Sequence, residues 1–193
     1  VGRSFFSPED GGVYFSILLR PNRMEETVLM TTGASVAVAD AIQSVCGVYP
    51  QIKWVNDLYY EGKKVCGILA ELVTDPQKGI PEAVVVGVGI NCDSKFPEEL
   101  QEIAGNIPYA KDMKNRLAAE LAVRLLKLPT MISQREFLQK YREHSMVLRR
   151  WITLPQESGS SYFVREIGER GELILEDKDG KTRVLSTGEI SIR

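Results

Sequence analysis

The residues that most constrain the fold lie between positions 53 and 71, where two apolar segments flank a short polar turn. Each segment has the length and composition of a β-strand. Residues 60–63 supply the turn, and Gly62 is available there for a positive φ. The pattern therefore predicts a β-hairpin.

Polar groups lie at the ends of this hairpin. In an extended first segment, Lys53, Val55 and Asp57 share one face. Trp54 and Asn56 then lie on the other face. Two lysines, an Asn and an Asp are therefore predicted at the ends of a hairpin that is otherwise part of the core.

The second segment begins at Lys64 and carries Gly67 in its interior. An interior glycine weakens a strand, so it usually marks a bulge or a close approach to the backbone. Lysines beside a bare glycine backbone suit an anionic ligand with a flat apolar part.

This stretch resembles the signature of the biotin protein ligases, with the spacing Lys53-Trp54-x-Asn56-Asp57 and then Lys64-x-x-Gly67-Ile68-Leu69-x-Glu71. Val55 is a departure, because the family often has proline there. Valine restores a backbone N–H and frees φ, but no chemical group is lost. The chain starts without an initiator Met, and we expect it to be an N-terminally incomplete member of that family.

The resemblance implies a two-step reaction with ATP and biotin as substrates and magnesium accompanying ATP. The carboxylate of biotin attacks the α-phosphorus of ATP, which gives biotinyl-adenylate and pyrophosphate. A lysine of a biotin carboxyl carrier domain then takes the biotinyl group and releases AMP. No catalytic triad, carboxylate pair or metal cluster competes with this interpretation in the sequence.

Three residues are the predicted catalytic groups. Two anions meet in the first step, so a cation must lie between them, and Lys64 is the candidate. Lys53 would hold phosphate. Asp57 would either bind magnesium or act as a base toward the carrier lysine, and the sequence leaves both roles open.

Further residues are predicted to bind biotin or ATP. Trp54 would support the wall of the pocket, and Asn56 and Asn91 would orient ribose and phosphate oxygens. The other predicted contacts are Gly2, Arg3, Phe5, Gly67, Ile68, Leu69, Gly87, Gly89 and Arg193.

Residues 81–91 contain a continuous apolar run that begins at Ala83, which predicts a strand buried on both faces. Gly87-x-Gly89 invites a dinucleotide-binding interpretation, but the third glycine is missing and a loop follows instead of a helix. The glycines would instead let a flat ring lie on the sheet. Gly-x-Gly-Ile-Asn also resembles the next motif of the biotin protein ligase family. Glycines placed only for packing remain the alternative.

Residues 2–21 are predicted to be a loop that leads into a strand from Val13 to Leu19. Gly2, Arg3 and Phe5 match the tail of the family's Gly/Arg-rich loop. The upstream arginine of that loop and the preceding strand and helix are not in this sequence. Arg3 is therefore either a solvated loop residue or a phosphate contact.

Residues 30–48 have the spacing of an amphipathic helix that ends at Gly47. Residues 92–111 are a long irregular stretch of the kind that forms lids, and the resemblance places it over the nucleotide. Asp112 is predicted to cap a second helix, and Ser133-x-x-Glu136 to form the capping box of a third. His144 lies near the end of that helix and is predicted to be a C-terminal helix residue rather than a catalyst.

After about residue 147 the sequence changes to short β segments punctuated by glycine, at 151–154, 162–167, 172–176, 182–185 and 189–193. Asp179-Gly180 is a strong hairpin signal. The spacing predicts a small SH3-like barrel. By resemblance, Glu189 and Arg193 would face the catalytic domain, with the arginine near the ATP phosphates, whereas an ordinary charged strand end is the alternative for Glu189.

The predicted fold class is α+β. A mixed β-sheet with helices on one side, like that of class II synthetases and biotin ligases, is followed by the small C-terminal barrel. The predicted domains are residues 1–147, which bind biotin and ATP, and residues 148–193.

The net charge and the cysteines bear on the partners and the cellular compartment of the protein. The net charge of −2 gives no reason to expect a nucleic-acid-binding face. Cys46, Cys66 and Cys92 lie in apolar runs without a C-x-x-C spacing, which predicts buried free thiols and a cytoplasmic protein. No apolar run of membrane-spanning length and no signal peptide is apparent.

Three alternatives remain at this point. A lipoate-type ligase of the same fold would share the chemistry, although the quoted motifs favour biotin. A fragment that binds biotin or the carrier without turnover would lack adenylate formation. A DNA-binding repressor would need a helix-turn-helix ahead of residue 1. The resemblance also allows a homodimer.

Overall fold

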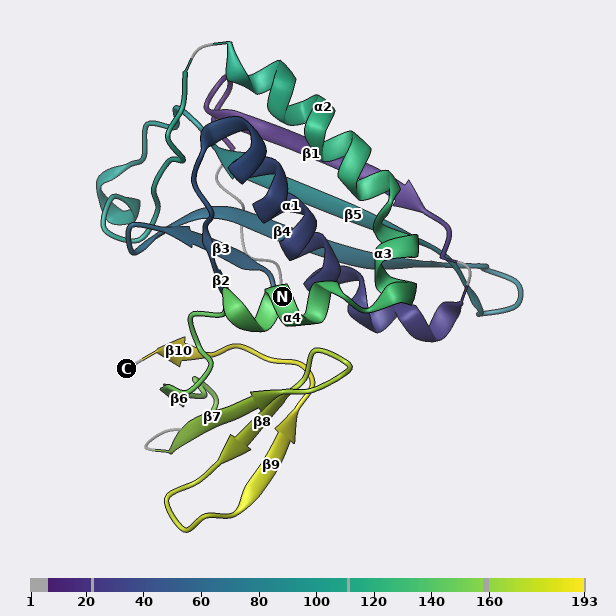
Figure 1. Cartoon of the computed structure of the whole chain (residues 1–193), viewed down its shortest axis with the longest axis vertical. Coiled ribbons are helices and arrows are strands. Elements are labelled where there is room, and N and C mark those ends of the chain that lie inside the picture. Colours follow the sequence, from purple (N-terminus) through teal and green to yellow (C-terminus); the bar gives the residue numbers. More distant parts are fainter. Residues whose placement is uncertain (1–6, 22, 111, 158–159, 193) are drawn as a thin grey trace.

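Two five-stranded antiparallel sheets and a layer of helices make up the computed structural model, which describes residues 7–21, 23–110, 112–157 and 160–192 (Figure 1). The first sheet has the strand order β1-β5-β4-β3-β2. Its strands are β1 (Gly12–Leu19), β2 (Gln51–Lys53), β3 (Asp57–Tyr60), β4 (Lys63–Thr74) and β5 (Pro81–Asn91).

The helices lie on one face of this sheet in the described part of the chain (Figure 1). They are α1 (Met30–Cys46), α2 (Met113–Leu126), α3 (Leu128–Gln134) and α4 (Phe137–Glu143), with 3₁₀ turns η1 (Met24–Leu29) and η2 (Glu98–Leu100). The α+β class and the one-sided helical layer agree with the prediction. The ladders between named strands are all antiparallel, and the described residues pair in parallel only at isolated bridges, so the sheet is not mixed in its ladders.

Helix α1 is the centre of the core. It packs against β4 and β5 on one side and against α2, α3 and α4 on the others. Its first three turns are buried almost all round, and a Cβ on Gly33 would lie 2.9 Å from the Leu128 side chain. The helix is therefore enclosed rather than amphipathic, because it has no face left for solvent.

By length and composition, the segment Glu26–Cys46 is apolar enough to cross a membrane. The sequence pattern did not predict such a segment. In the fold it consists of η1 and α1, and 67% of the apolar window is buried inside the protein. Burial of this kind is typical of a core helix.

The helix boundaries show where local signals succeed and fail. Gly47 has φ 76° and its N–H bonds to the Gln43 carbonyl, so the predicted C-terminal cap is confirmed. Asp112 precedes α2 but makes no side-chain capping bond. The predicted capping box is wrong, because Ser133 lies within α3 and its hydroxyl donates to the buried Glu26 carboxylate at 3.0 and 3.1 Å.

The first segment of the predicted hairpin is not one strand. Strand β2 ends at Lys53, residues 54–56 form a turn, and β3 begins at Asp57, which pairs directly with Lys53. The buried side chain of Trp54 and the turn-forming Asn56 make bonds that an extended chain would not allow. The predicted alternation of faces across residues 53–57 is therefore wrong.

The second sheet has the order β10-β6-β7-β8-β9. Its strands are β6 (Trp151–Thr153), β7 (Ser161–Ile167), β8 (Leu173–Glu176), β9 (Thr182–Leu185) and β10 (Ser191–Ile192), close to the five predicted segments. Gly180 has φ 80° in the β8–β9 turn, as its position in a hairpin requires. No ladder joins β9 to β10 in the described residues, so a closed barrel is not established.

Adjacent leucines in α2 offer a direct test of this packing. Leu125 is 0% exposed and its neighbour Leu126 is 65% exposed. We expect Leu125→Ala to lower the free energy of unfolding by about 2–5 kcal/mol, since it empties a filled core site. Leu126→Ala should change it by less than about 0.5 kcal/mol. Urea unfolding of both variants measures the difference, and equal losses would contradict the placement of α2.

The three cysteines offer a second test. All are free, Cys66 and Cys92 are buried, and Cys46 is partly buried. Burial raises the pKa of each thiol, that of Cys92 to about 11. Because the thiolate is the reactive form, a disulfide reagent at pH 8 should react slowly with the native protein and rapidly after unfolding. A raised thiol pKa stabilises the fold below the unfolded pKa, and for Cys92 this contribution should be lost between about pH 9 and 11. Rapid labelling of all three thiols in the native state would contradict this burial.

Candidate active site

A patch of bare backbone lies in the middle of the first sheet. Gly67 of β4 is paired with Gly89 of β5, and Leu69 with Gly87. Directly paired residues point to the same side of a sheet. The intervening Ile68 and Val88 are buried in the core, so the three glycines face away from the helices. We call Gly67, Gly87 and Gly89 the glycine patch.

Packing within the described residues does not require a glycine at position 87. A Cβ there would lie 3.8 Å from the Ser16 hydroxyl and 3.9 Å from the Leu69 carbonyl, which are ordinary contacts. A flat ligand lying on the sheet would require the bare backbone at Gly87, whereas the neighbouring side chains do not require it.

Strand β1 borders the patch on its far side. Tyr14 is paired with Gly89 and Ser16 with Gly87, so both side chains point to the same face as the glycines. The sequence interpretation missed these two residues. Alternation along the strand from Val13 to Leu19 was the signal that would have found them, once the strand had been paired with the glycine motif.

An ion pair lies beside the patch. The Lys64 ammonium is 2.6 Å from the Asp57 carboxylate, with the side chains 37% and 23% exposed. Asp57 is itself paired with Gly67 across β3 and β4. The structure therefore brings two predicted catalytic residues into contact at the edge of the glycine patch.

A β-bulge directs Lys64 to this side. Leu58 pairs with Cys66 whereas Tyr59 pairs with Lys64, which leaves Val65 as the extra residue. Without the shift, Lys64 would share the core-facing side of Cys66. The extra residue reverses the alternation, as bulges next to functional sites often do. Gly67 was predicted to mark either a bulge or a close approach to the backbone, and the bulge occurs two residues earlier, at Val65.

Lys53 lies close by through its backbone pairing with Asp57. Its ammonium group, however, lies 5.7 Å from the centre of the Tyr59 ring. Burial, and then the Asp57 carboxylate, raise the pKa of the Tyr59 phenol, so this ring stays neutral beneath the cation. Lys53, the third predicted catalytic residue, therefore lies near the Lys64–Asp57 ion pair but is not part of it.

Both predicted asparagines bind backbone. The Asn56 amide donates to the Ile68 carbonyl at 2.6 Å, and the Ile68 N–H donates to the Asn56 carbonyl at 3.0 Å. The buried Asn91 amide donates to the Gly105 carbonyl at 3.1 Å and to that of Lys64 at 3.5 Å. These bonds fix the turn and the loop around Lys64.

The predicted lid is tied to the sheet over part of its length. The Lys64 N–H donates to the Ile103 carbonyl at 2.9 Å, and the Gly105 N–H donates to the Lys64 carbonyl at 2.9 Å. The Ile107 N–H bonds to the Asn91 carbonyl at 3.0 Å. We call residues 103–107 the loop strap. The strap binds the backbone of the candidate catalytic lysine, so this part of the predicted lid is closed against the sheet.

The remaining predicted residues divide into two groups. Trp54 is buried behind the turn, and the Ile68 side chain is in the core, so any contact of Ile68 with a ligand on the patch would come from its backbone. The predicted site residues that lie outside the described part of the chain are Gly2, Arg3, Phe5 and Arg193.

His144 does not join the site. It is the C-terminal cap of α4, as predicted, and its ring stacks on Tyr49 with 3.8 Å between centroids. Burial, and then the nearby Lys140, lower its pKa, so the imidazole is neutral near neutral pH.

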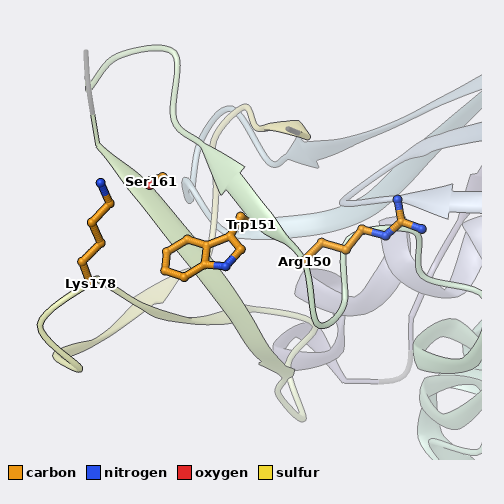
Figure 2. A pocket seen from close by; sticks show the side chains of 4 residues that line it. All are labelled: Arg150, Trp151, Ser161 and Lys178. Atoms are coloured by element: carbon orange, nitrogen blue, oxygen red, sulfur yellow. The ribbon is translucent and has the colours of Figure 1, made fainter.

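The described residues form other hollows but no cluster of side chains that could bind a metal ion. Within the described ranges, no group of three or more His, Cys, Asp and Glu side chains could hold a metal ion. A shallow hollow does occur in the second sheet, lined by Arg150, Trp151, Ser161 and Lys178 (Figure 2). It includes none of the predicted site residues.

Comparison with known proteins relates these motifs to one group. The model of the biotin/lipoate A/B protein ligase family matches residues 1–91. The chain is 30% identical over 210 residues to the bifunctional ligase/repressor BirA of Escherichia coli, a match that covers all of this chain and 62% of that protein. It is 36% identical over 118 residues to BirA of Bacillus subtilis, covering 59% of this chain and 36% of that protein.

The fold has a solved counterpart. The biotin protein ligase of Aquifex aeolicus in complex with biotin and ATP is similar with a TM-score of 0.79 and 26% identity. The similarity covers 100% of this chain and 82% of that one. The chain spans less than two thirds of the length of the curated relatives just described.

The loop strap can be tested through Asn91. Asn91→Ala removes the donor to the Gly105 carbonyl, so we expect the unfolding free energy to fall by about 1–3 kcal/mol. The Lys64 amide, which donates to the Ile103 carbonyl, and the Ile107 amide, which donates to the Asn91 carbonyl, should also exchange faster with solvent. Asn115→Ala, at an exposed position of α2, is the matched control. Unchanged exchange at Lys64 would show that Asn91 does not hold the strap.

Proposed function

Because the chain belongs to the biotin protein ligase family, we propose that it activates biotin with ATP and transfers the biotinyl group to a lysine of a biotin carboxyl carrier protein. The observation that carries the proposal is the Lys64–Asp57 ion pair at the edge of the glycine patch. A relative named biotin–[acetyl-CoA-carboxylase] ligase and a structural neighbour in complex with biotin and ATP support it.

Lys64 acts in the first step. The carboxylate of biotin and the triphosphate of ATP repel each other, and a fixed ammonium between them offsets that repulsion. Asp57 holds the ammonium in place before substrates arrive. As charge moves from the biotin carboxylate to the leaving pyrophosphate, a cation preorganised at this point stabilises the transition state.

The neighbouring residues bind the two substrates. The glycine patch gives a flat ring or an extended acyl chain direct access to the backbone, with Leu69 as an exposed apolar neighbour. Lys53 would contact phosphate by turning from Tyr59. We also propose phosphate contacts for Arg3 and Arg193, ring contacts for Gly2 and Phe5, and ribose or phosphate contacts for the side-chain amides of Asn56 and Asn91.

Magnesium would enter with ATP as part of the substrate. A single carboxylate together with substrate phosphates is a usual environment for this ion, and Asp57 fits that role once Lys64 turns toward the phosphates. The alternative role of Asp57 is to accept the proton of the carrier lysine in the second step. Both roles need a carboxylate at this position.

The wider architecture belongs to the proposal as well. We divide the chain into a catalytic domain at residues 1–147 and a second domain at 148–193, since the two sheets share no strand. Five short strands in sequence support an SH3-like barrel for the second domain. Free cysteines in apolar surroundings support a cytoplasmic location.

The decisive experiment is adenylate formation with biotin and Mg-ATP, followed by mass spectrometry. We expect biotinyl-adenylate from the wild type, and a rate about 10²–10³-fold lower from Lys64→Ala. Lys78→Ala is the control, because that lysine lies at the exposed β4–β5 turn and pairs with Asp75. Addition of a biotin carboxyl carrier domain should then give a biotinylated lysine.

Other results would change the assignment. Equal rates from wild type and Lys64→Ala would remove that lysine from the mechanism. Adenylate formation with lipoate but not biotin would make the chain a lipoate-type ligase. Binding of biotin without any adenylate would leave a binding protein without turnover.

A further inference from the structure

The loop between β7 and β8 of the second sheet reaches the turn at residues 54–56. The buried indole N–H of Trp54 donates to the Gly171 carbonyl at 2.8 Å. Gly171 has φ 76°, and a Cβ there would lie 2.9 Å from the Thr32 side chain on α1. Both the backbone conformation and the close approach therefore require a glycine at this point.

Helix α4 holds the same loop. The Arg142 guanidinium donates to the Ile167 carbonyl at 2.8 Å and to the Glu169 carboxylate at 2.7 Å. Arg135 donates to the Glu169 carbonyl at 2.8 Å. The Arg142 contact also lowers the pKa of Glu169, which keeps the carboxylate charged.

Tyr141, which precedes Arg142 in α4, binds the turn itself. The fully buried Tyr141 hydroxyl donates to the Val55 carbonyl at 3.1 Å. Adjacent residues of one helix thus hold the loop, through Arg142, and the turn, through Tyr141. The Trp54 indole closes this arrangement by joining the turn to the loop directly.

The turn leads directly into the catalytic pair. Asp57 follows Asn56, and its carboxylate lies 2.6 Å from the Lys64 ammonium. A displacement of the turn would move Asp57 along β4 and change the position of the ammonium. Misplacement of a reacting group by about 1 Å can reduce a rate by about 10²-fold.

We propose that Trp54 is a positioning residue, and that its bond to Gly171 makes the second sheet part of the scaffold that sets the Asp57–Lys64 geometry. The inference rests on the proposed function for its kinetic consequence. Its structural consequence, a turn held by the β7–β8 loop, is independent of any activity.

The two tryptophans of the chain provide a matched pair of variants. Trp54→Phe retains an aromatic ring but removes the N–H, and leaves the Gly171 carbonyl without that donor. Trp151→Phe makes the same chemical change on the outer surface of β6, where the ring is 41% exposed beside Arg150 and Lys178 (Figure 2). Trp151 contacts Phe163 and none of the proposed catalytic residues.

The kinetic measurement is biotinyl-adenylate formation by the full chain, with kcat and both KM values determined. Because biotin is proposed to bind the glycine patch and the Trp54 ring is buried behind the turn, Trp54→Phe should lower kcat about 10–100-fold and change KM for biotin by less than about threefold. Trp151→Phe should match the wild type. Urea unfolding of each variant identifies conditions in which the protein is fully folded.

A second pair of variants separates positioning from simple loss of stability. Arg142→Gln weakens the hold on the loop while leaving Trp54 intact, and should lower kcat about 3–10-fold. Arg165→Gln removes an ion pair with Glu176 that lies wholly within the second sheet, and should leave kcat unchanged. Equal effects of the two arginine variants would overturn the inference.

Amide exchange provides the readout that does not depend on activity. We expect peptides spanning residues 54–68 to exchange at least about tenfold faster in Trp54→Phe than in Trp151→Phe. Unchanged exchange, or a kcat equal to that of the wild type, would overturn the inference. If wild type forms no adenylate while exchange still increases, the proposed function fails but the positioning contact stands.

Discussion

The pairing of Gly67 on both of its sides is the constraint on which the site depends. Asp57 lies opposite it in one ladder and Gly89 in the other, so the backbone register alone places a carboxylate beside bare backbone. A slip of one residue would turn the glycines into the core and the apolar side chains outward. Burial of alternate residues of β4 and β5 against α1 prevents that slip, and helix packing therefore protects the geometry of the opposite face.

Long periodic signals and glycine turns could be interpreted correctly from the sequence. The strand ending at Asn91, the helix ending at Gly47 and the short strands of the second sheet all lie within a few residues of their predicted positions. The motif also placed Lys64 and Asp57 in one predicted site, although the contact between their side chains was not predicted. Such features depend on local backbone preferences and on the alternation of apolar and polar residues, and both can be seen in a short stretch of sequence.

Features that depend on distant contacts were not predictable in this way. The turn at Trp54 forms because its indole finds a carbonyl 117 residues away. The serine at position 133 bonds a buried glutamate 107 residues earlier instead of capping a helix. The bulge at Val65 arises from pairing with β3 and leaves no mark in composition. In each case a tertiary bond overrides a sound local preference.

The enclosed position of α1 has a consequence for how the chain folds during synthesis. Its apolar surface is covered by β4 and β5 on one side and by α2 and α3 on another, and those helices lie roughly 70–100 residues further along the chain. Until they emerge from the ribosome, the side of this apolar helix that faces α2 and α3 has no partner. Complete burial of α1 is therefore a late, non-local event, and until then the nascent chain exposes apolar surface of the kind that is prone to aggregate.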